Sequence, residues 1–93
     1  MITPIEITLL TRSDCALCDH AKDVLGRVAA DYPLRIAQVD LNTEQGRHLA
    51  KSTWVVLAPG VLIDGKPFSH GRLSERKLRR TLNKRRFPAP DTT

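Results

Sequence analysis

The chain of 93 residues contains two cysteines, Cys15 and Cys18, separated by Ala16 and Leu17. On a helix, residues three apart are neighbours whose Cβ atoms lie about 5–6 Å apart, close to the separation that a disulfide spans. Three roles are compatible with this spacing: a disulfide that opens and closes, half of a metal site, or two small apolar side chains in an ordinary helix. The rest of the chain must distinguish among them.

A zinc site needs about four ligands. Beyond the cysteine pair, the only imidazoles that the chain offers are those of His20, His48 and His70. They form no second motif with the spacing of metal ligands. We therefore expect no metal site within one chain, and we expect no tightly bound cofactor. His20 lies two residues beyond Cys18 and points to a different face of the helix, so we expect an exposed side chain rather than a catalytic base.

The composition is that of a soluble globular protein, with 41% hydrophobic and 27% charged residues. We expect one domain over residues 1–87 and a flexible, proline-containing tail over 88–93. No apolar run is long enough to span a membrane, and residues 1–10 lack the features of a signal peptide. We therefore expect a cytoplasmic protein, and in that compartment a cysteine pair is more often catalytic or metal-binding than a structural disulfide.

The elements around the cysteines are a strand and a helix. Residues 5–10 are β-branched and leucine-rich, which indicates a strand covered on both faces. After a loop at 11–14, apolar side chains recur every three or four residues, as on one face of a helix, until Pro33 ends the pattern. Cys15 is thus expected at the start of this helix, and Cys18 one turn inside it on the apolar face.

The remaining elements follow from the same criteria. We expect a strand at 34–40, a short helix capped by Asn42 or Thr43, an apolar extended stretch at 54–58, strands at 61–63 and 66–69, and a last helix capped by Ser74. Gly46 argues against the short helix, and Asp64-Gly65 predicts a hairpin. The result is an α/β fold in the order β-α-β-α-β-β-α, a four-stranded mixed sheet flanked by three helices, with Trp54 and Phe68 in its core.

The position of Cys15 at a helix start predicts different roles for the two thiols. Unpaired backbone N–H groups at the helix end stabilise a nearby anion by about 0.3–1 kcal/mol, which favours the Cys15 thiolate. The adjacent carboxylate of Asp14 opposes it by a similar amount, because exposed charge pairs are worth about 0–1 kcal/mol. We therefore expect Cys15 to be the nucleophile and Cys18 the resolving thiol of a reductant or exchanger, rather than of a strong oxidant.

The segments TRSDCALC, APGVLIDG and HGRLSERKL, in this order, resemble the glutaredoxin-like branch of the thioredoxin superfamily over about residues 5–85. The resemblance implies a thioredoxin-like fold and a redox pair formed by Cys15 and Cys18. It also implies that Arg12 is the basic residue common before the pair, that Pro59 is a cis-proline facing the active site, and that Gly71 precedes the last helix. The backbone of Ala58 would then pair with an extended substrate, and Leu17 offers an exposed apolar contact.

Two segments differ from the glutaredoxin pattern. Ala16 and Leu17 stand where glutaredoxins usually have Pro and Tyr. Residues 73–75, Leu-Ser-Glu, replace the acidic pair that in many glutaredoxins holds the amine of glutathione. We expect the substrates to be disulfide-containing proteins or small thiols. Glutathione, another low-molecular-weight thiol or a flavoprotein reductase is then the electron donor.

The basic residues gather at the C-terminal end: residues 72–93 carry eight Lys or Arg against two acidic residues. The last helix also presents Leu78 and Leu82 for packing and has no interleaved aromatic residues, so we expect a solvated face of a monomer and no nucleic acid. Two alternatives stay open. One is a thioredoxin-fold binding module whose basic helix holds a partner, and the other is an iron–sulfur carrier made of two chains with an external thiol.

Overall fold

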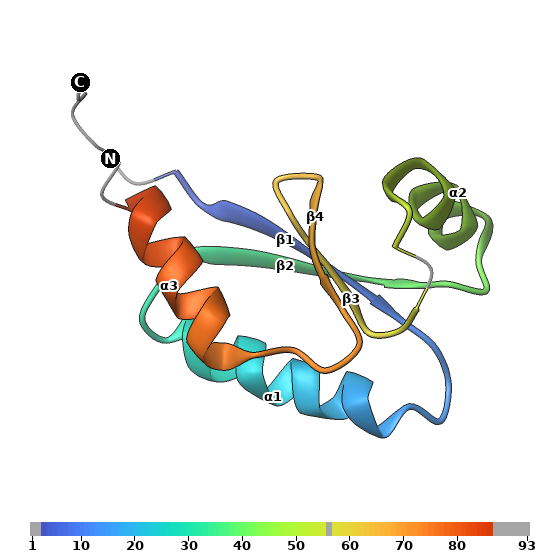
Figure 1. The fold of residues 1–93 in the computed structure, drawn as a ribbon, viewed down its shortest axis with the longest axis horizontal. Helices are drawn as coiled ribbons and strands as arrows, with labels where there is room; N and C mark the ends of the chain where they lie inside the picture. Colours follow the sequence, from blue (N-terminus) through green and yellow to red (C-terminus); the bar gives the residue numbers. More distant parts are fainter. Residues whose placement is uncertain (1–2, 56, 87–93) are drawn as a thin grey trace.

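The computed structural model describes residues 3–55 and 57–86, so the predicted tail at 88–93 lies outside the described residues. The predicted order of elements is confirmed (Figure 1). The elements are β1 (Ile5–Thr11), α1 (Ala16–Ala29), β2 (Leu34–Asp40), α2 (Glu44–Thr53), β3 (Gly60–Ile63), β4 (Lys66–His70) and α3 (Glu75–Arg86). Within the described part of the chain, no helix is long and apolar enough to cross a membrane.

The sheet has four strands in the order β2-β1-β3-β4 and is mixed, as predicted. β1 runs parallel to β2, and β3 runs antiparallel to both β1 and β4. Leu10 near the end of β1 pairs with Gly60 at the start of β3, which in turn pairs with His70 at the end of β4. One edge of the sheet therefore gathers the residues that follow β1, precede β3 and follow β4.

The helices cover both faces of the sheet. α1 and α3 lie on one face and α2 on the other, near the ends of β1 and β2 (Figure 1). The larger core lies under α1 and α3 and includes Ile7, Leu9, Val24, Leu25, Leu78 and Leu82. The smaller core, under α2, consists of Leu10, Val39, Val55 and Leu62.

The short helix α2 forms in spite of Gly46. Thr43 caps it, because its hydroxyl oxygen accepts a hydrogen bond from the Gly46 amide at 3.0 Å. Gly46 is buried where the helix meets the end of β2. A Cβ there would overlap the carbonyl oxygen of Asp40 and lie 2.8 Å from the Cα of Leu41. The glycine that weakens the sequence prediction is thus the residue that permits this contact.

The prediction of an extended stretch at 54–58 is wrong, because β3 begins only at Gly60. Trp54 ends α2 in the left-handed conformation, with φ of 63°. The chain turns here because the Thr53 hydroxyl donates to the Leu49 carbonyl at 2.6 Å and accepts from the Val55 amide at 3.4 Å. Val56 lies outside the described residues.

The prediction that Trp54 belongs to the core is also wrong, since its side chain is 86% exposed. The turn after Thr53 places Val55, which is 3% exposed, under α2 instead. Phe68 is half-buried against the larger core, as expected.

Ion pairs connect α1 to α3. One carboxylate oxygen of Glu75 accepts from the Nε and Nη2 of Arg27 at 3.1 and 2.9 Å, and the other accepts from Nε of Arg79 at 3.0 Å. Arg79 also donates to Asp31 at 2.7 Å. Hydrogen bonds from Arg27 and then Arg79 hold the pKa of Glu75 below its usual value. Ionised Glu75 therefore stabilises the contact between the two helices.

Replacing Glu75 with glutamine is expected to lower the stability slightly, in a pH-dependent way. A depressed folded-state pKa stabilises the protein above the unfolded-state pKa, and this contribution disappears as the pH falls through the folded-state pKa. The wild type should therefore exceed Glu75→Gln in thermal stability above about pH 5, and the two should converge in more acidic buffer. Melting curves between neutral and acidic pH check this, and a pH-independent difference contradicts it.

Candidate active site

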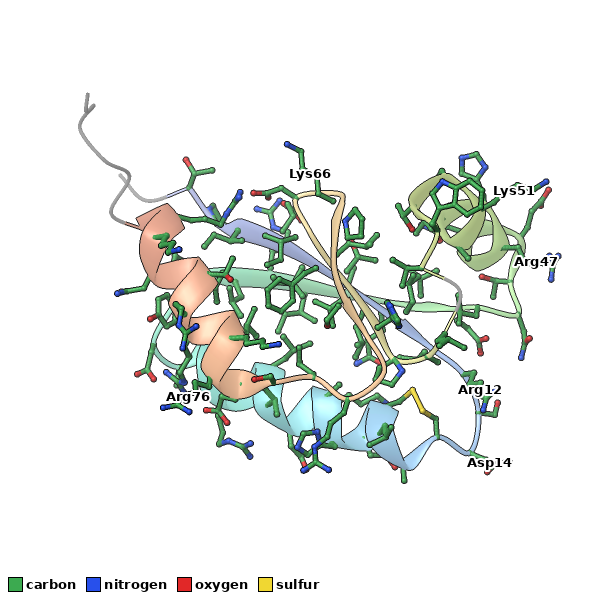
Figure 2. All side chains as sticks on the ribbon, viewed as in Figure 1. Arg12, Asp14, Arg47, Lys51, Lys66 and Arg76 are labelled. Carbon is green, nitrogen blue, oxygen red and sulfur yellow. A yellow bond between two sulfur atoms is a disulfide. The ribbon has the colours of Figure 1, made fainter. Side chains whose placement is uncertain are left out.

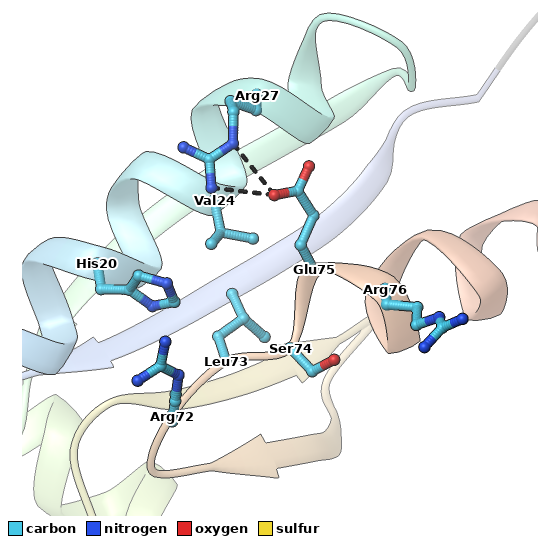
Figure 3. A pocket seen from close by; sticks show the side chains of 8 residues that line it. All are labelled: His20, Val24, Arg27, Arg72, Leu73, Ser74, Glu75 and Arg76. Carbon is cyan, nitrogen blue, oxygen red and sulfur yellow. Dashed lines mark hydrogen bonds and ion pairs between the residues drawn. The ribbon is translucent and has the colours of Figure 1, made fainter.

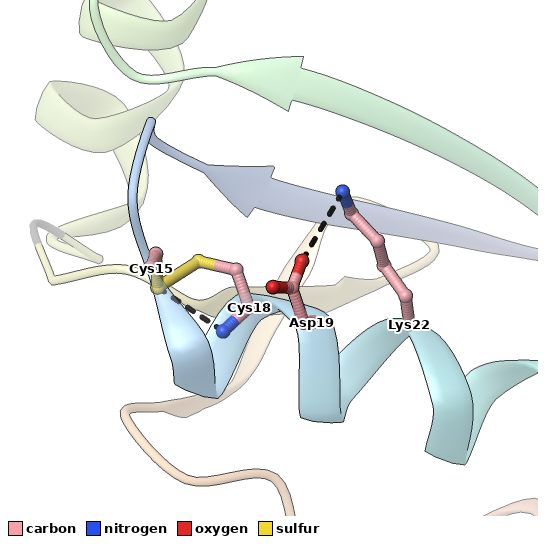
Figure 4. Close-up of a disulfide and its surroundings, with 4 residues drawn as sticks. All are labelled: Cys15, Cys18, Asp19 and Lys22. Atoms are coloured by element: carbon pink, nitrogen blue, oxygen red, sulfur yellow. Dashed lines mark hydrogen bonds and ion pairs between the residues drawn. A yellow bond between two sulfur atoms is a disulfide. The ribbon is translucent and has the colours of Figure 1, made fainter.

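The two cysteines occupy the start of α1, as predicted. Cys15 is the N-cap residue in an extended conformation, and its Sγ accepts a hydrogen bond from the Cys18 amide at 3.1 Å. The carbonyl of Cys15 accepts from the amides of Cys18 and Asp19 at 3.1 and 3.2 Å. The sulfurs form a disulfide across a Cα–Cα separation of 5.2 Å (Figure 4). One sulfur thus occupies the capping position, where backbone N–H groups stabilise negative charge.

The two cysteine residues differ in exposure. Cys15 is half-buried, whereas Cys18 is 2% exposed. Cys18 belongs to the buried face of α1, together with Ala21, Val24 and Leu25. A molecule that approaches from solvent therefore meets Cys15 first.

The sheet register brings the residues around Pro59 and Gly71 to the same edge as the segment that leads to Cys15. The Gly71 amide donates to the Pro59 carbonyl at 2.8 Å, so the two residues are in direct contact. The Ala58–Pro59 peptide bond is cis, as the resemblance implies, with Pro59 buried and Ala58 half-buried. The segment that leads into β3 passes beside the disulfide (Figures 2 and 4).

The segments next to the pair in sequence and before Pro59 expose charged and apolar side chains. Arg12 and Asp14 lie at the end of the molecule that holds the disulfide (Figure 2). Arg12 is exposed and makes no ion pair within the described residues, so a role in substrate binding stays a prediction. Leu17 is 40% exposed and Leu57 is 56% exposed. We did not predict the exposure of Leu57, because its segment has the composition of a buried strand.

Asp14 is exposed and adopts the left-handed conformation, with φ of 52°. Asparagine tolerates that conformation, so Asp14→Asn removes the charge without adding strain. The variant should stabilise the Cys15 thiolate and make the disulfide more oxidising, by up to about 20 mV, because an exposed charge pair is worth up to about 1 kcal/mol. Equilibration with glutathione buffers measures the shift. Asp23→Asn, two turns into α1, is the matched control. A potential that rises no more in Asp14→Asn than in Asp23→Asn, or that falls, contradicts the prediction.

His20 differs from its prediction. It is half-buried rather than exposed, and its Nδ1 is buried without a hydrogen-bond partner among the described residues. Its ring points toward Arg72 in a pocket of about 360 Å³ between α1 and the start of α3 (Figure 3). Glu75 lines the same pocket and is bound to Arg27. Residues 3–55 and 57–86 contain no group of three or more His, Cys, Asp or Glu side chains that could hold a metal ion.

Comparisons with known proteins show which sequences and folds this chain is similar to. The chain is 25% identical over 87 residues to uncharacterized proteins of Mycobacterium bovis and Mycobacterium tuberculosis, covering 91% of this chain and 90% of each relative. A structure described as a malarial protein superposes with a TM-score of 0.68 and 15% identity, covering 88% of this chain and 97% of that one.

A mutant thioredoxin from Halobacterium salinarum superposes with a TM-score of 0.67 and 17% identity, covering 88% of this chain and 74% of that one. These likenesses establish a thioredoxin-like fold. The model of the glutaredoxin-like domain (DUF836) matches residues 6–83. With its cysteine pair at disulfide distance on that fold, the chain belongs to the glutaredoxin-like domain family.

Proposed function

We propose that this protein is a thiol-disulfide oxidoreductase that uses Cys15 as nucleophile and Cys18 as resolving thiol. The observation that carries the proposal is the asymmetry of the pair. Cys15 caps α1 and is half-buried, while Cys18 lies one turn inside at 2% exposure. This asymmetry supports attack from solvent by Cys15 and resolution from the interior by Cys18.

In the proposed reaction, the reduced protein begins with Cys15 as thiolate. Its sulfur attacks a substrate disulfide, which breaks the substrate S–S bond, forms a mixed disulfide on Cys15 and releases the first substrate thiolate. Deprotonated Cys18 then attacks the Cys15 sulfur, closes the Cys15–Cys18 disulfide and releases the second substrate thiolate. Two electrons pass from the protein to the substrate. The Cys18 amide lies 3.1 Å from the Cys15 sulfur in the disulfide, and in the reduced protein it would donate to the Cys15 thiolate.

The surroundings of the pair supply the proposed substrate contacts. Leu17 and Leu57 offer exposed apolar surface. The backbone at Ala58, before cis-Pro59, would pair with an extended segment of the substrate. Gly71, held to Pro59 through its amide, would shape the opposite side, and Arg12 would attract an anionic group.

The oxidised protein requires an external reductant, for which we propose a low-molecular-weight thiol or a flavoprotein reductase. Two donor thiols would each lose one electron as they reopen the disulfide and become a disulfide themselves. The acid nearest to Gly71 on its C-terminal side, Glu75, is engaged by Arg27 and Arg79. It is not free to hold the amine of glutathione, which favours a donor recognised in some other way.

Turnover of a model substrate tests this function. The wild type is expected to accelerate the reduction of a peptide disulfide by dithiothreitol, and Cys15→Ser should return the rate to background. Ser13→Ala, which alters a nearby exposed residue without touching a thiol, serves as the control and should retain the acceleration. Equal rates for wild type and Cys15→Ser would refute the assignment.

A second candidate is a binding module without redox turnover, and one observation favours it. The solvent-facing side of α3 presents Arg76, Lys77, Arg80 and Lys84. Within the described residues these cations make no ion pair, whereas Arg79 and Arg85 are bound to acidic side chains. A chain that binds acidic proteins through this face and fails to accelerate disulfide reduction would have this function instead.

A further inference from the structure

Trp54, the only tryptophan of the chain, lies at the end of α2 with 86% of its surface exposed. Tryptophan is highly buried on average in folded proteins, and a large apolar surface left in solvent is the informative exception. Its backbone is left-handed, with φ of 63°. Many helices end with a residue in this conformation, but that residue is usually glycine or asparagine. Neither burial nor backbone geometry therefore explains a tryptophan at this position.

A groove of about 530 Å³ lies beside this indole. Leu41, Ala50 and Trp54 supply its apolar surface, and Arg47 and Lys51 supply its charge. Both cationic side chains extend outward from α2 (Figure 2). Arg47 is held by a hydrogen bond to the Asn42 carbonyl at 2.7 Å, and within the described residues neither cation makes an ion pair. Among the described residues, no acidic side chain lines the groove.

The groove lies at the same edge of the sheet as the cysteine pair. The amide of Leu41 donates to the carbonyl of Thr11 at 2.8 Å, and Thr11 begins the segment that leads to Cys15. Leu57, 56% exposed, follows Trp54 on the way to Pro59. A protein seated in the groove therefore lies at the end of the molecule that holds the disulfide.

We propose that this groove docks an acidic segment of a partner protein, with one apolar side chain against Trp54 and carboxylates on Arg47 and Lys51. Tryptophan and arginine are the residue types that most often dominate binding energy at protein interfaces. A second copy of this chain is a poor occupant, because its net charge is +5 and the groove itself is cationic. Leu41 and Ala50 add aliphatic surface beside the indole, which favours an apolar side chain of a protein. A nucleic acid whose bases stack on Trp54 is an outcome of the test.

The single tryptophan makes the groove directly observable, because all indole fluorescence comes from Trp54. The oxidised chain of 93 residues is titrated with a tryptophan-free peptide that alternates glutamate with leucine and phenylalanine. We expect a saturable blue shift of the emission that weakens at high salt. A matched peptide with glutamine in place of glutamate should bind at least about tenfold more weakly.

Two charge variants separate the groove from the general basicity of the chain. Arg47→Glu with Lys51→Glu should weaken the acidic peptide at least about tenfold. Arg80→Glu with Lys84→Glu, which changes the net charge equally on α3, should have a much smaller effect. Trp54→Gly, measured by polarisation of a labelled peptide, should lose binding without a decrease in thermal stability, because glycine accepts the left-handed conformation.

Several results would overturn the proposal. The peptide titration would do so if the emission did not change with either peptide, or if both peptides bound with equal affinity. So would an α3 variant that lost as much affinity for the acidic peptide as the groove variant. The remaining two results are a blue shift on concentrating the protein alone and tighter binding of oligothymidine than of the acidic peptide. The last two would identify a second copy of the chain or a nucleic acid as the occupant. Because no thiol takes part, these outcomes are independent of the proposed oxidoreductase function.

Discussion

Replacing Cys18 with serine is expected to arrest the protein as a mixed disulfide on Cys15. In the wild type the buried Cys18 sulfur, held one helical turn from Cys15, resolves this intermediate, and serine cannot replace it. After reaction with a peptide disulfide, intact mass should show Cys18→Ser carrying one peptide. The wild type should instead accumulate as its own disulfide.

Cys15→Ser is the complementary variant. Its remaining thiol is 2% exposed in the wild-type structure, so we expect almost no adduct. Turnover should fall at least about a thousandfold, the order of loss seen when a covalent nucleophile is removed. Adduct formation at Cys18 as fast as at Cys15 would contradict the roles assigned to the two sulfurs.

Replacing Gly46 with alanine is expected to give a larger loss of stability than any surface substitution in this protein. A helical glycine normally costs about 0.5–1 kcal/mol relative to alanine, so helix propensity favours this change. The new Cβ, however, would overlap the Asp40 carbonyl oxygen and crowd the Cα of Leu41, both of which are backbone atoms that cannot rotate away. We expect the steric effect to dominate and to lower the free energy of unfolding by about 3 kcal/mol.

Gly26 provides the matched control. It also lies inside a helix, α1, but it is exposed and a Cβ there would meet no atom within 4 Å. Gly26→Ala should raise the free energy of unfolding by about 0.5–1 kcal/mol. Denaturant or thermal unfolding of both variants checks the pair of predictions. A Gly46→Ala protein as stable as Gly26→Ala would show that α2 is not fixed against β2 as described.

The order of elements and the position of the cysteine pair were predictable, because local signals determine them. The β-branched and leucine-rich run at 5–10 indicates a strand, helical periodicity after Cys15 indicates a helix that Pro33 ends, and Asp64-Gly65 indicates a hairpin. Handedness and crossover length then leave few arrangements of the sheet. The burial of Cys18 followed from its place on the apolar face of α1.

The segment around Trp54 was not predictable, because tertiary contacts decide its conformation. Residues 54–58 have the composition of a strand, yet hydrogen bonds of the Thr53 hydroxyl turn the chain and place Val55 rather than Trp54 in the core. The need for glycine at position 46 likewise depends on the close approach of α2 to the Asp40 carbonyl. Neither contact has a signal in the neighbouring sequence, and the groove beside Trp54 depends on both.

The central claim is that Cys15 and Cys18 cycle between dithiol and disulfide, and a redox titration tests it most directly. The protein is equilibrated in thiol buffers of defined potential and alkylated, and its free thiols are counted by intact mass. We predict one two-electron transition from two free thiols to none, with a midpoint well below the value of about −120 mV found for strong oxidants. Cys15→Ser should show no such transition. Two free thiols in the wild type at every potential would contradict the claim.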